Sequence, residues 1–362
     1  MQVREFFKSD VAEVVTLYWN YLAKRDGPVP AELRTSFTEL YFSNPLSDAS
    51  PSFVYQDLSG DVLGFMGVTT RTMLLSGQLV RVGFAGNFVI HPKARSSVAA
   101  PSLLGAFIAG DQDLLITDTA NDISRHLMQR LRFQTIPELN IHWARPLRAS
   151  QYLIHGLARG MSPSVSAVLR FATKPLWGIV DRLAESTLTH SRKAKELVYA
   201  TELTVESLLD CLVEFRKGCT LQAQYGLEEL RWLLRFMQRN RKRGILRGML
   251  LRNGGHKTVG WYLYYAKRGG IGEVVQIGGP PDLSNDIFEH LLEDARAQGV
   301  IALHGRADFG RLPELSDLGC FFTCRGGWTL AFTRHSKIMD ILRSAKVSLS
   351  RLDGEWCLDP GE

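Results

Sequence analysis

Residues 82–104 read VGFAGNFVIHPKARSSVAAPSLL: an apolar run, a His-Pro pair, a loop of small residues and a second apolar run. The first run predicts a buried strand, and the second predicts a helix that begins near Pro101. A loop that enters a helix N-terminus presents backbone N–H groups without helical partners, at the positive end of the helix dipole. Such a loop is suited to bind a phosphate or pyrophosphate group.

The composition is that of a folded protein large enough for two domains. The chain has 362 residues, of which 45% are hydrophobic and 22% are charged,. No stretch of about 18 apolar residues predicts a membrane-spanning helix, and charges at Arg4, Glu5, Lys8 and Asp10 interrupt any signal peptide,. We therefore expect a cytoplasmic protein. The net charge of +6 suits CoA phosphates, an anionic membrane or RNA, and does not choose among them,.

The five cysteines predict neither a disulfide framework nor a metal site. Their number is odd, and the N-terminal residues do not predict a signal peptide,. Cys320 and Cys324 are separated by three residues and have no second pair, so they lack the usual spacing of a zinc site,. We expect these two cysteines to serve packing in an apolar, strand-like segment.

The order of predicted elements occurs twice along the chain. Residues 1–149 read as strand, two helices, three strands, helix, strand, helix and strand, and residues 198–362 repeat this βααβββαβαβ order,. The predicted fold class is therefore α/β (α+β), with two mixed-sheet domains in tandem. We expect each domain to complete its own sheet, with residues 141–147 in the first and residues 328–333 in the second.

Residues 150–197 predict a helical connector between these domains. Three amphipathic segments alternate with basic side chains. Such a segment either packs on the domains or presents a basic surface to a membrane or a partner.

Two motifs in the first domain resemble those of the Gcn5-related N-acetyltransferase (GNAT) superfamily. Residues 95–100 keep the frame of its pyrophosphate loop, Arg/Gln-x-x-Gly-x-Gly/Ala, with Val98 at the first glycine. Residues 121–133 keep the frame Asn-x-x-Ala-x-x-Leu-Tyr-x-x-x-Gly-Phe, with Met128 at the tyrosine. Residues 260–265 and 348–356 resemble the C-terminal half of bacterial tandem-GNAT proteins, which often accompany biosynthetic gene clusters.

The resemblance implies an acyl-CoA co-substrate, acetyl-CoA or another, in the first domain. The fourth strand would hold the pantetheine arm, and the following loop would hold the phosphates. The implied cofactor-binding residues are Phe88, Val89, Ile90, Arg95, Ser96, Ser97, Val98, Ala99, Ala100 and Asn121. Because a β-branched residue resists positive φ and is bulkier than glycine, Val98 predicts weaker CoA binding or a remodelled loop.

Several polar residues are candidates for catalysis or acceptor binding. Asp118, His91 and His304 could carry protons, although Asp118 could instead form a turn or cap a helix, and His91 could merely end its strand,. In the second domain, Pro280 and Pro281 remove N–H donors from the loop position, so CoA binding is not expected there. The candidate acceptor-binding residues of that domain are Tyr262, Tyr264, Gln276, Arg306 and Asp308. The last two could also form a salt-bridged strand end.

The sequence favours an acyltransferase, and above all an N-acetyltransferase. It would move an acyl group directly from acyl-CoA to a small or carrier-bound amine within a ternary complex, and a homodimer is compatible with it. A Fem-type transferase that uses aminoacyl-tRNA is a less favoured alternative. A non-catalytic binding module is a third, because of the residues at positions 98, 128 and 280–281.

Overall fold

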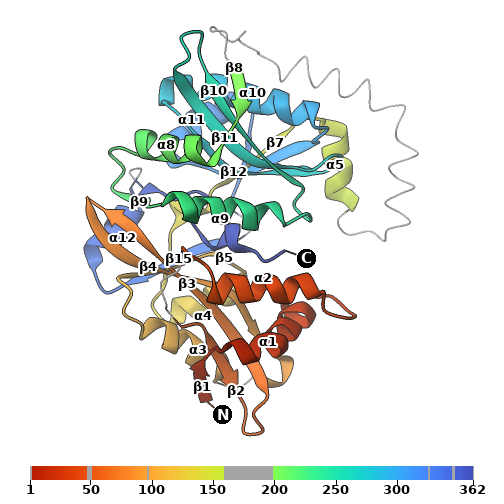
Figure 1. Ribbon diagram of the computed structural model, residues 1–362, viewed down its shortest axis with the longest axis vertical. Coiled ribbons are helices and arrows are strands. Elements are labelled where there is room, and N and C mark those ends of the chain that lie inside the picture. Colours follow the sequence, from red (N-terminus) through yellow and green to blue (C-terminus); the bar gives the residue numbers. More distant parts are fainter. Residues whose placement is uncertain are drawn as a thin grey trace. The chain divides into compact units, whose positions relative to one another are not determined.

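The computed structural model describes residues 2–46, 51–95, 98–158, 199–324, 327–344 and 347–361. It has a mixed α/β architecture with two sheets (Figure 1). The chain divides into two compact units, each assembled from separate segments. Unit 1 comprises Met1–Asn140, Arg216–Lys242 and Arg325–Glu362, and unit 2 comprises Ile141–Phe215 and Arg243–Cys324.

The sheet of unit 1 combines strands from both ends of the chain. Its main path is β1 (Gln2–Glu5), β2 (Phe53–Gln56), β3 (Val62–Leu75), β4 (Gln78–Ile90), β5 (Leu114–Ala120), β15 (Trp328–Thr333) and β6 (Gln134–Thr135). Two further strands extend from β3, namely β9 (Leu221–Ala223) and β16 (Val347–Ser348). The β4–β5 pair is parallel, whereas β3–β4 and β5–β15 are antiparallel.

Helices cover both faces of this sheet because its central strands alternate apolar side chains between the faces. The helices are α1 (Val11–Leu17), α2 (Ala31–Phe42), α3 (Ala99–Ile108), α4 (Asp122–Arg130), α9 (Leu227–Gln238) and α12 (Ser336–Leu342). α1 continues into a π-helical turn, Tyr18–Leu22. On β4, Phe84 packs in the core with α12, while the next residue, Ala85, packs in the core with α3.

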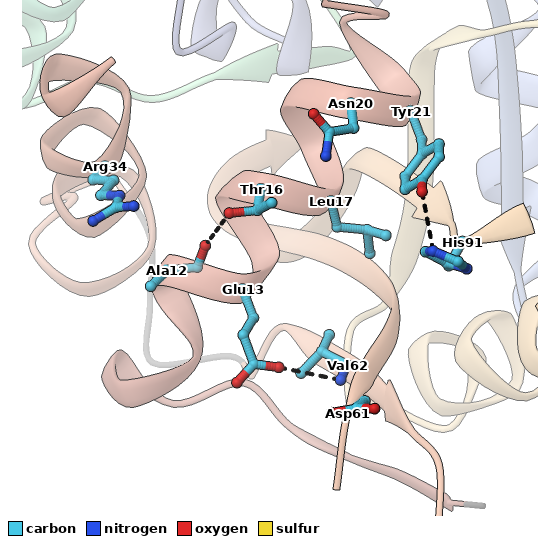
Figure 2. Close-up of a pocket in the computed structure, with 10 residues that line it drawn as sticks. All are labelled: Ala12, Glu13, Thr16, Leu17, Asn20, Tyr21, Arg34, Asp61, Val62 and His91. Carbon is cyan, nitrogen blue, oxygen red and sulfur yellow. Dashed lines mark hydrogen bonds between the residues drawn. The ribbon is translucent and has the colours of Figure 1, made fainter. Parts of the chain in front are cut away.

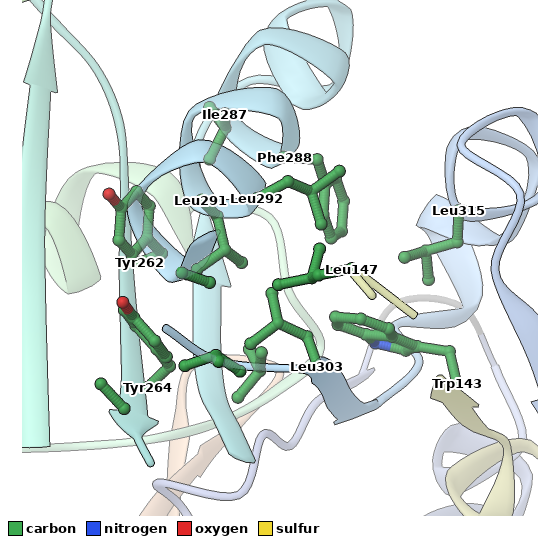
Figure 3. Packing of buried hydrophobic residues seen from close by; sticks show 14 of the residues in the cluster. Trp143, Leu147, Tyr262, Tyr264, Ile287, Phe288, Leu291, Leu292, Leu303 and Leu315 are labelled. Carbon is green, nitrogen blue, oxygen red and sulfur yellow. The ribbon is translucent and has the colours of Figure 1, made fainter. Parts of the chain in front are cut away.

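Unit 2 repeats the arrangement. Its sheet runs β14 (Phe321–Thr323), β7 (His142–Pro146), β13 (Ala302–Arg306), β12 (Ile271–Gly278), β11 (Thr258–Ala266), β10 (Ile245–Arg252) and β8 (Tyr199–Glu202). Its helices are α5 (Ala149–Ala158), α8 (Val205–Phe215), α10 (Ser284–Ala297) and α11 (Leu312–Asp317). Apolar side chains of α10 pack on β11 and β13 in one core (Figure 3).

The expectation that each domain completes its own sheet is wrong. β7 pairs with β13 and β14 in unit 2, and Trp143 packs in the unit 2 core against Phe288 (Figure 3). β15 instead pairs with β5 and β6 in unit 1. Backbone pairing carries little sequence information, so an element order cannot show which of two similar sheets accepts a strand. The predicted connector lies mostly outside the described residues, and its role stays a prediction.

None of the helices in the described part of the chain is long and apolar enough to cross a membrane. The cytoplasmic location stays a prediction.

Candidate active site

The centre of unit 1 is the point where β4 and β5 separate. The two strands pair only from Val82–Leu114 to Phe84–Ile116, and β4 then continues to Ile90. An extra residue in β4 creates a bulge, because Gly67 opposes Gly86 whereas Phe65 opposes Val89. Asn87, with φ of 51°, occupies this bulge. Bulges redirect strands and side chains beside functional sites.

The C-terminal tail places a carboxyl group next to this point. Glu355 begins a 3₁₀ helix, Glu355–Leu358, and is 8% exposed. Its Oε1 accepts hydrogen bonds from Thr117 Oγ1 at 3.1 Å and from Thr119 Oγ1. Its Oε2 is buried without a hydrogen-bond partner, and a Cβ on Gly86 of β4 would lie 3.0 Å from this oxygen.

Asp118 and Tyr41 complete the surroundings of this carboxyl group. Asp118, 4% exposed, accepts the Glu355 backbone N–H at 3.1 Å. Burial and the charge of Asp118 raise the pKa of Glu355 to about 8, although the two threonine hydrogen bonds oppose the shift,. Burial and Glu355 also raise the pKa of Tyr41, whose hydroxyl accepts a hydrogen bond from Asn87 Nδ2 at 2.8 Å. Tyr41 is therefore a neutral phenol at physiological pH.

A buried ion pair fixes the tail. Arg216 donates to both oxygens of Asp353, at 3.0 and 2.9 Å, and both side chains are buried. Tyr225 Oη donates to Asp353 Oδ1 at 2.9 Å, and Ser350 Oγ donates to Oδ2 at 2.7 Å. Although burial opposes ionisation, Arg216 and Ser350 hold the pKa of Asp353 below its ordinary value. Asp353 is therefore a carboxylate at neutral pH.

Arg71 of β3 binds the backbone of the same tail. Its guanidinium donates to the carbonyl oxygens of Leu352 at 3.2 Å, Asp353 at 3.1 Å and Gly354 at 3.4 Å. Arg71 is 3% exposed. We call Arg71, Arg216, Tyr225 and Asp353 the tail clamp.

The loop after β4 has an ordinary backbone where it enters α3. Val98 is the N-cap with φ of −76°, so the backbone at this position does not require glycine. Its side chain is exposed, as is that of Arg95. Ala99 is buried and Ala100 is half-buried in the first turn of α3, while Ser96 and Ser97 lie outside the described residues.

His91 is at the end of β4 and contacts the π-helical turn. Tyr21 Oη lies 3.0 Å from His91 Nε2, and His91 Nδ1 accepts the backbone N–H of Lys93 at 3.1 Å (Figure 2). Burial, Lys93 and Arg95 lower the pKa of His91, so its imidazole is neutral at pH 7. The same basic side chains give this loop a positive potential, which suits a phosphate.

A pocket of about 400 Å³ opens beside His91. Figure 2 shows it between the first helix, the start of β3 and Arg34 of α2. Its lining is mixed: Glu13 and Asp61 are acidic, Arg34 is basic, and Leu17 and Val62 are apolar.

The other cofactor candidates of unit 1 have structural contacts. Phe88 and Ile90 pack against the core that contains α3, and Val89 is in the core that contains α1 and α2. Asn121 caps α4 by accepting the Ser124 backbone N–H at 2.9 Å. Their roles toward a cofactor stay predictions.

The candidates in unit 2 are largely engaged within that unit. Tyr262 and Tyr264 are fully buried, with their hydroxyls 2.9 Å from His290 Nδ1 and 2.8 Å from Asp294 Oδ2 on α10. His304 Nε2 lies 3.1 Å from Tyr152 Oη of α5. These three contacts connect helices α10 and α5 to the sheet. Acceptor binding by these residues stays a prediction.

Three further candidates lie toward the ends of their strands. Gln276 of β12 is buried with Oε1 lacking a hydrogen-bond partner. Arg306 ends β13, and Asp308 caps the following turn by accepting the Gly310 N–H at 3.1 Å.

The loop of unit 2 that corresponds to the phosphate loop is contacted by Arg311, from the turn that precedes α11. Arg311 donates to the Gly279 carbonyl oxygen at 2.6 Å and to Ser284 Oγ at 2.8 Å. Pro281 starts a 3₁₀ turn there and contributes no N–H,.

The predicted catalytic residues do not form one group. Asp118 lies in the Glu355 cluster, His91 contacts Tyr21, and His304 belongs to unit 2. Glu355 and the residues of the tail clamp are not among the candidates that the sequence predicted. The polar sequence Asp353-Gly354-Glu355, within a tail that resembles tandem-GNAT proteins, is a signal that could have indicated them.

The chain shares its fold with solved structures described as a probable N-acyltransferase and a GCN5-related N-acetyltransferase, so the GNAT-type fold that the resemblance implied is confirmed. A conserved Enterococcus faecalis V583 protein described as a probable N-acyltransferase matches with a TM-score of 0.60 and 12% identity. The match covers 91% of this chain and 72% of that one. No family model and no curated protein sequence matches.

Two further solved structures share the fold. Saccharomyces cerevisiae N-myristoyltransferase with bound myristoyl-CoA has a TM-score of 0.53 and 10% identity, over 91% of this chain and 78% of that one. A GCN5-related N-acetyltransferase from Anabaena variabilis ATCC 29413 has a TM-score of 0.57 and 10% identity, over 92% of this chain and 73% of that one. At these identities the likeness is one of fold.

Proposed function

We propose that the protein is an acyl-CoA-dependent N-acyltransferase whose acyl donor binds in unit 1. The observation that carries the proposal is the separation of β4 from β5 beside a buried carboxyl cluster. Structures that share the fold include an N-myristoyltransferase with bound myristoyl-CoA and a GCN5-related N-acetyltransferase.

The donor would lie along the β4 edge that β5 leaves. Backbone groups of Phe88, Val89 and Ile90 would bind the pantetheine arm and polarise the thioester carbonyl. Lys93, Arg95 and the first turn of α3 would face the phosphates,. The acceptor would be a small or carrier-bound amine, and the acyl group would pass to it directly.

Calorimetric titration with acetyl-CoA and with longer acyl-CoAs tests donor binding. We expect a micromolar Kd and release of free CoA in the presence of a reactive amine. Ala100→Trp should abolish binding, because the new side chain would fill the approach to the first turn of α3. Gly105→Trp is the matched control, since Gly105 lies on the exposed side of the same helix and a Cβ added there would meet no other atom within 4 Å.

The same titration separates the alternatives. Salt-sensitive binding of aminoacyl-tRNA without acyl-CoA binding would replace this proposal with a Fem-type transferase. Binding of neither donor would indicate a non-catalytic module.

A further inference from the structure

The Glu355 side chain is buried, and one of its two carboxyl oxygens has no hydrogen-bond partner. The carboxyl group is held on one side by Thr117 and Thr119, while Oε2 faces Gly86 of β4 without a hydrogen-bond partner. An unpaired buried carboxyl oxygen costs free energy unless a ligand or a proton satisfies it. Gly86 provides the space for this oxygen, since a side chain there would crowd it.

We propose that Glu355 is the general base that deprotonates the acceptor amine, and that the tail clamp positions it. This inference rests on the proposed acyltransferase function. It places a residue of the C-terminal tail in the active site of unit 1, next to the β4 edge assigned to the thioester.

The proton and electron movements balance as follows. The Glu355 carboxylate takes one proton from R–NH3+, and the freed nitrogen lone pair attacks the thioester carbonyl carbon. The C–N bond forms, the oxyanion collapses and the C–S bond breaks. The nitrogen gives its extra proton to the leaving thiolate, which departs as CoA thiol. Glu355 then releases its proton to solvent, and no further reactant is needed.

The charges around Glu355 adjust its basicity. The charge of Asp118 raises the pKa of Glu355, Tyr41 of α2 is a neutral phenol, and Thr117 and Thr119 donate hydrogen bonds. Arg71 and Cys357, which contact each other, lie in the same network around the tail. A base that titrates near pH 8 is matched to an amine substrate at physiological pH,. An approaching ammonium ion would favour its ionised form.

The tail clamp explains how a residue near the chain end reaches this position. Arg216 and Asp353 form a bidentate ion pair two residues before Glu355, and Arg71 binds three successive carbonyl oxygens of the tail. Planar guanidinium groups restrict orientation as well as distance. These residues act through Glu355 and are positioning residues.

Glu355→Gln tests the base directly. Gln keeps the oxygen that accepts from Thr117 and Thr119 but cannot take the proton. We expect kcat to fall by about 100-fold or more, while acyl-CoA Kd stays within about twofold. In the wild type, kcat/KM should rise with pH through an inflection near 8, and this inflection should vanish in the variant. The acceptor should be an amine whose own pKa lies outside the scanned range.

Glu228→Gln is the matched control, because Glu228 is an exposed residue of unit 1. Its rate and pH profile should equal those of the wild type. Binding of acyl-CoA by the wild type tests the proposed function, whereas Glu355→Gln tests the assignment of Glu355 as the general base. If the wild type binds acyl-CoA and turns over, but Glu355→Gln keeps both its rate and the inflection, the assignment of Glu355 is overturned.

Tyr225→Phe tests the clamp by removing the hydrogen bonds of one hydroxyl to Asp353 and Leu352. We expect kcat to fall several-fold with donor KM unchanged, and the pH inflection to move. A merely structural clamp would lower thermal stability without moving the inflection, and that result would contradict the positioning role.

Discussion

Asp118 and Glu355 bring two carboxyl groups together in the interior of unit 1, which destabilises the doubly ionised state. The threonine hydrogen bonds satisfy only one oxygen of Glu355. The unfavourable free energy of these two carboxyl groups must be offset by other contacts. The hydrogen bonds of the tail clamp provide such contacts,.

At the residue scale, Glu355→Gln should increase stability at alkaline pH. The pKa of Glu355 is about 8 in the folded protein and 4.5 in the reference state, so the folded protein binds more protons between these values. The free energy of unfolding contributed by this group therefore falls as pH rises from about 4.5 to 8. At about pH 8.5 the variant should exceed the wild type by a few kcal/mol, at about 1.4 kcal/mol per pKa unit.

Denaturant unfolding at both ends of this pH range measures the difference. At about pH 4.5 the two proteins should have nearly equal stability. A stability gap that does not depend on pH would show that Glu355 titrates normally.

A second residue-scale prediction concerns Gly354. A Cβ at this position would overlap Asp118 Oδ2, and the other oxygen of that carboxylate, Oδ1, accepts the Glu355 N–H of the tail. Gly354→Ala should therefore cost about 1–3 kcal/mol of unfolding free energy by overpacking. Gly105→Ala, a change in open space on α3, should not destabilise the protein,. Equal melting temperatures for Gly354→Ala and the wild type would contradict the tail position.

At the scale of the element, the entry into α3 does not depend on glycine. Val98 has φ of −76°, which any residue adopts,. We expect Val98→Ala and Val98→Gly to bind acyl-CoA with equal affinity, within about twofold, because both remove the side chain and neither relieves backbone strain. Calorimetry measures both Kd values. Clearly tighter acyl-CoA binding by Val98→Gly than by Val98→Ala would contradict this prediction and indicate that position 98 requires positive φ.

The Arg216–Asp353 ion pair also acts at the scale of the element, because it connects the tail to the segment that precedes β9. Asp353→Asn should cost about 3–5 kcal/mol, because Arg216 is left as a buried, unpaired charge,. The folded-state pKa of Asp353 is lowered, so this contribution is present above pH 3.8 and is lost as pH falls through the folded pKa,. Chemical denaturation at neutral and acid pH checks both points.

Glu39→Gln provides the matched control for the ion pair. Glu39 pairs with Arg239 at 2.6 Å, but both side chains are partly exposed. Its loss should cost less than about 1 kcal/mol. A similar cost for both variants would mean that burial of the Arg216–Asp353 pair has no special effect.

At the scale of the whole molecule, the exchange of strands makes the two halves of the sequence interdependent. A fragment of residues 1–149 lacks β15, so the β5 edge of its sheet is unpaired,. We expect this fragment alone to aggregate or remain unfolded. Residues 1–158 and 199–362, expressed together, should assemble and co-purify, because each sheet then has all its strands.

Circular dichroism and size-exclusion chromatography of the separate and combined fragments test this expectation. A monomeric, cooperatively folding fragment 1–149 would contradict it, because its sheet would then be stable without β15.

Local periodicity and turn residues predicted the order of most elements and the strand–loop–helix at residues 82–104. The resemblance of two motifs implied the GNAT-type fold, whereas β9 and α12 were not predicted. The sequence also pointed to Asp118. It did not reveal that Val98 has negative φ, since a residue type constrains but does not specify its backbone conformation,.

The sheets that receive β7 and β15, and the position of the tail, depend on long-range packing. Strand pairing uses backbone groups that all residues share, so similar sheets compete for a strand until side-chain packing, such as that of Trp143, selects one,. Glu355 acquires its environment from residues more than 200 positions away in the chain. Contacts of that range leave no periodic signal in the sequence, and they create the buried carboxyl group on which the proposed chemistry depends.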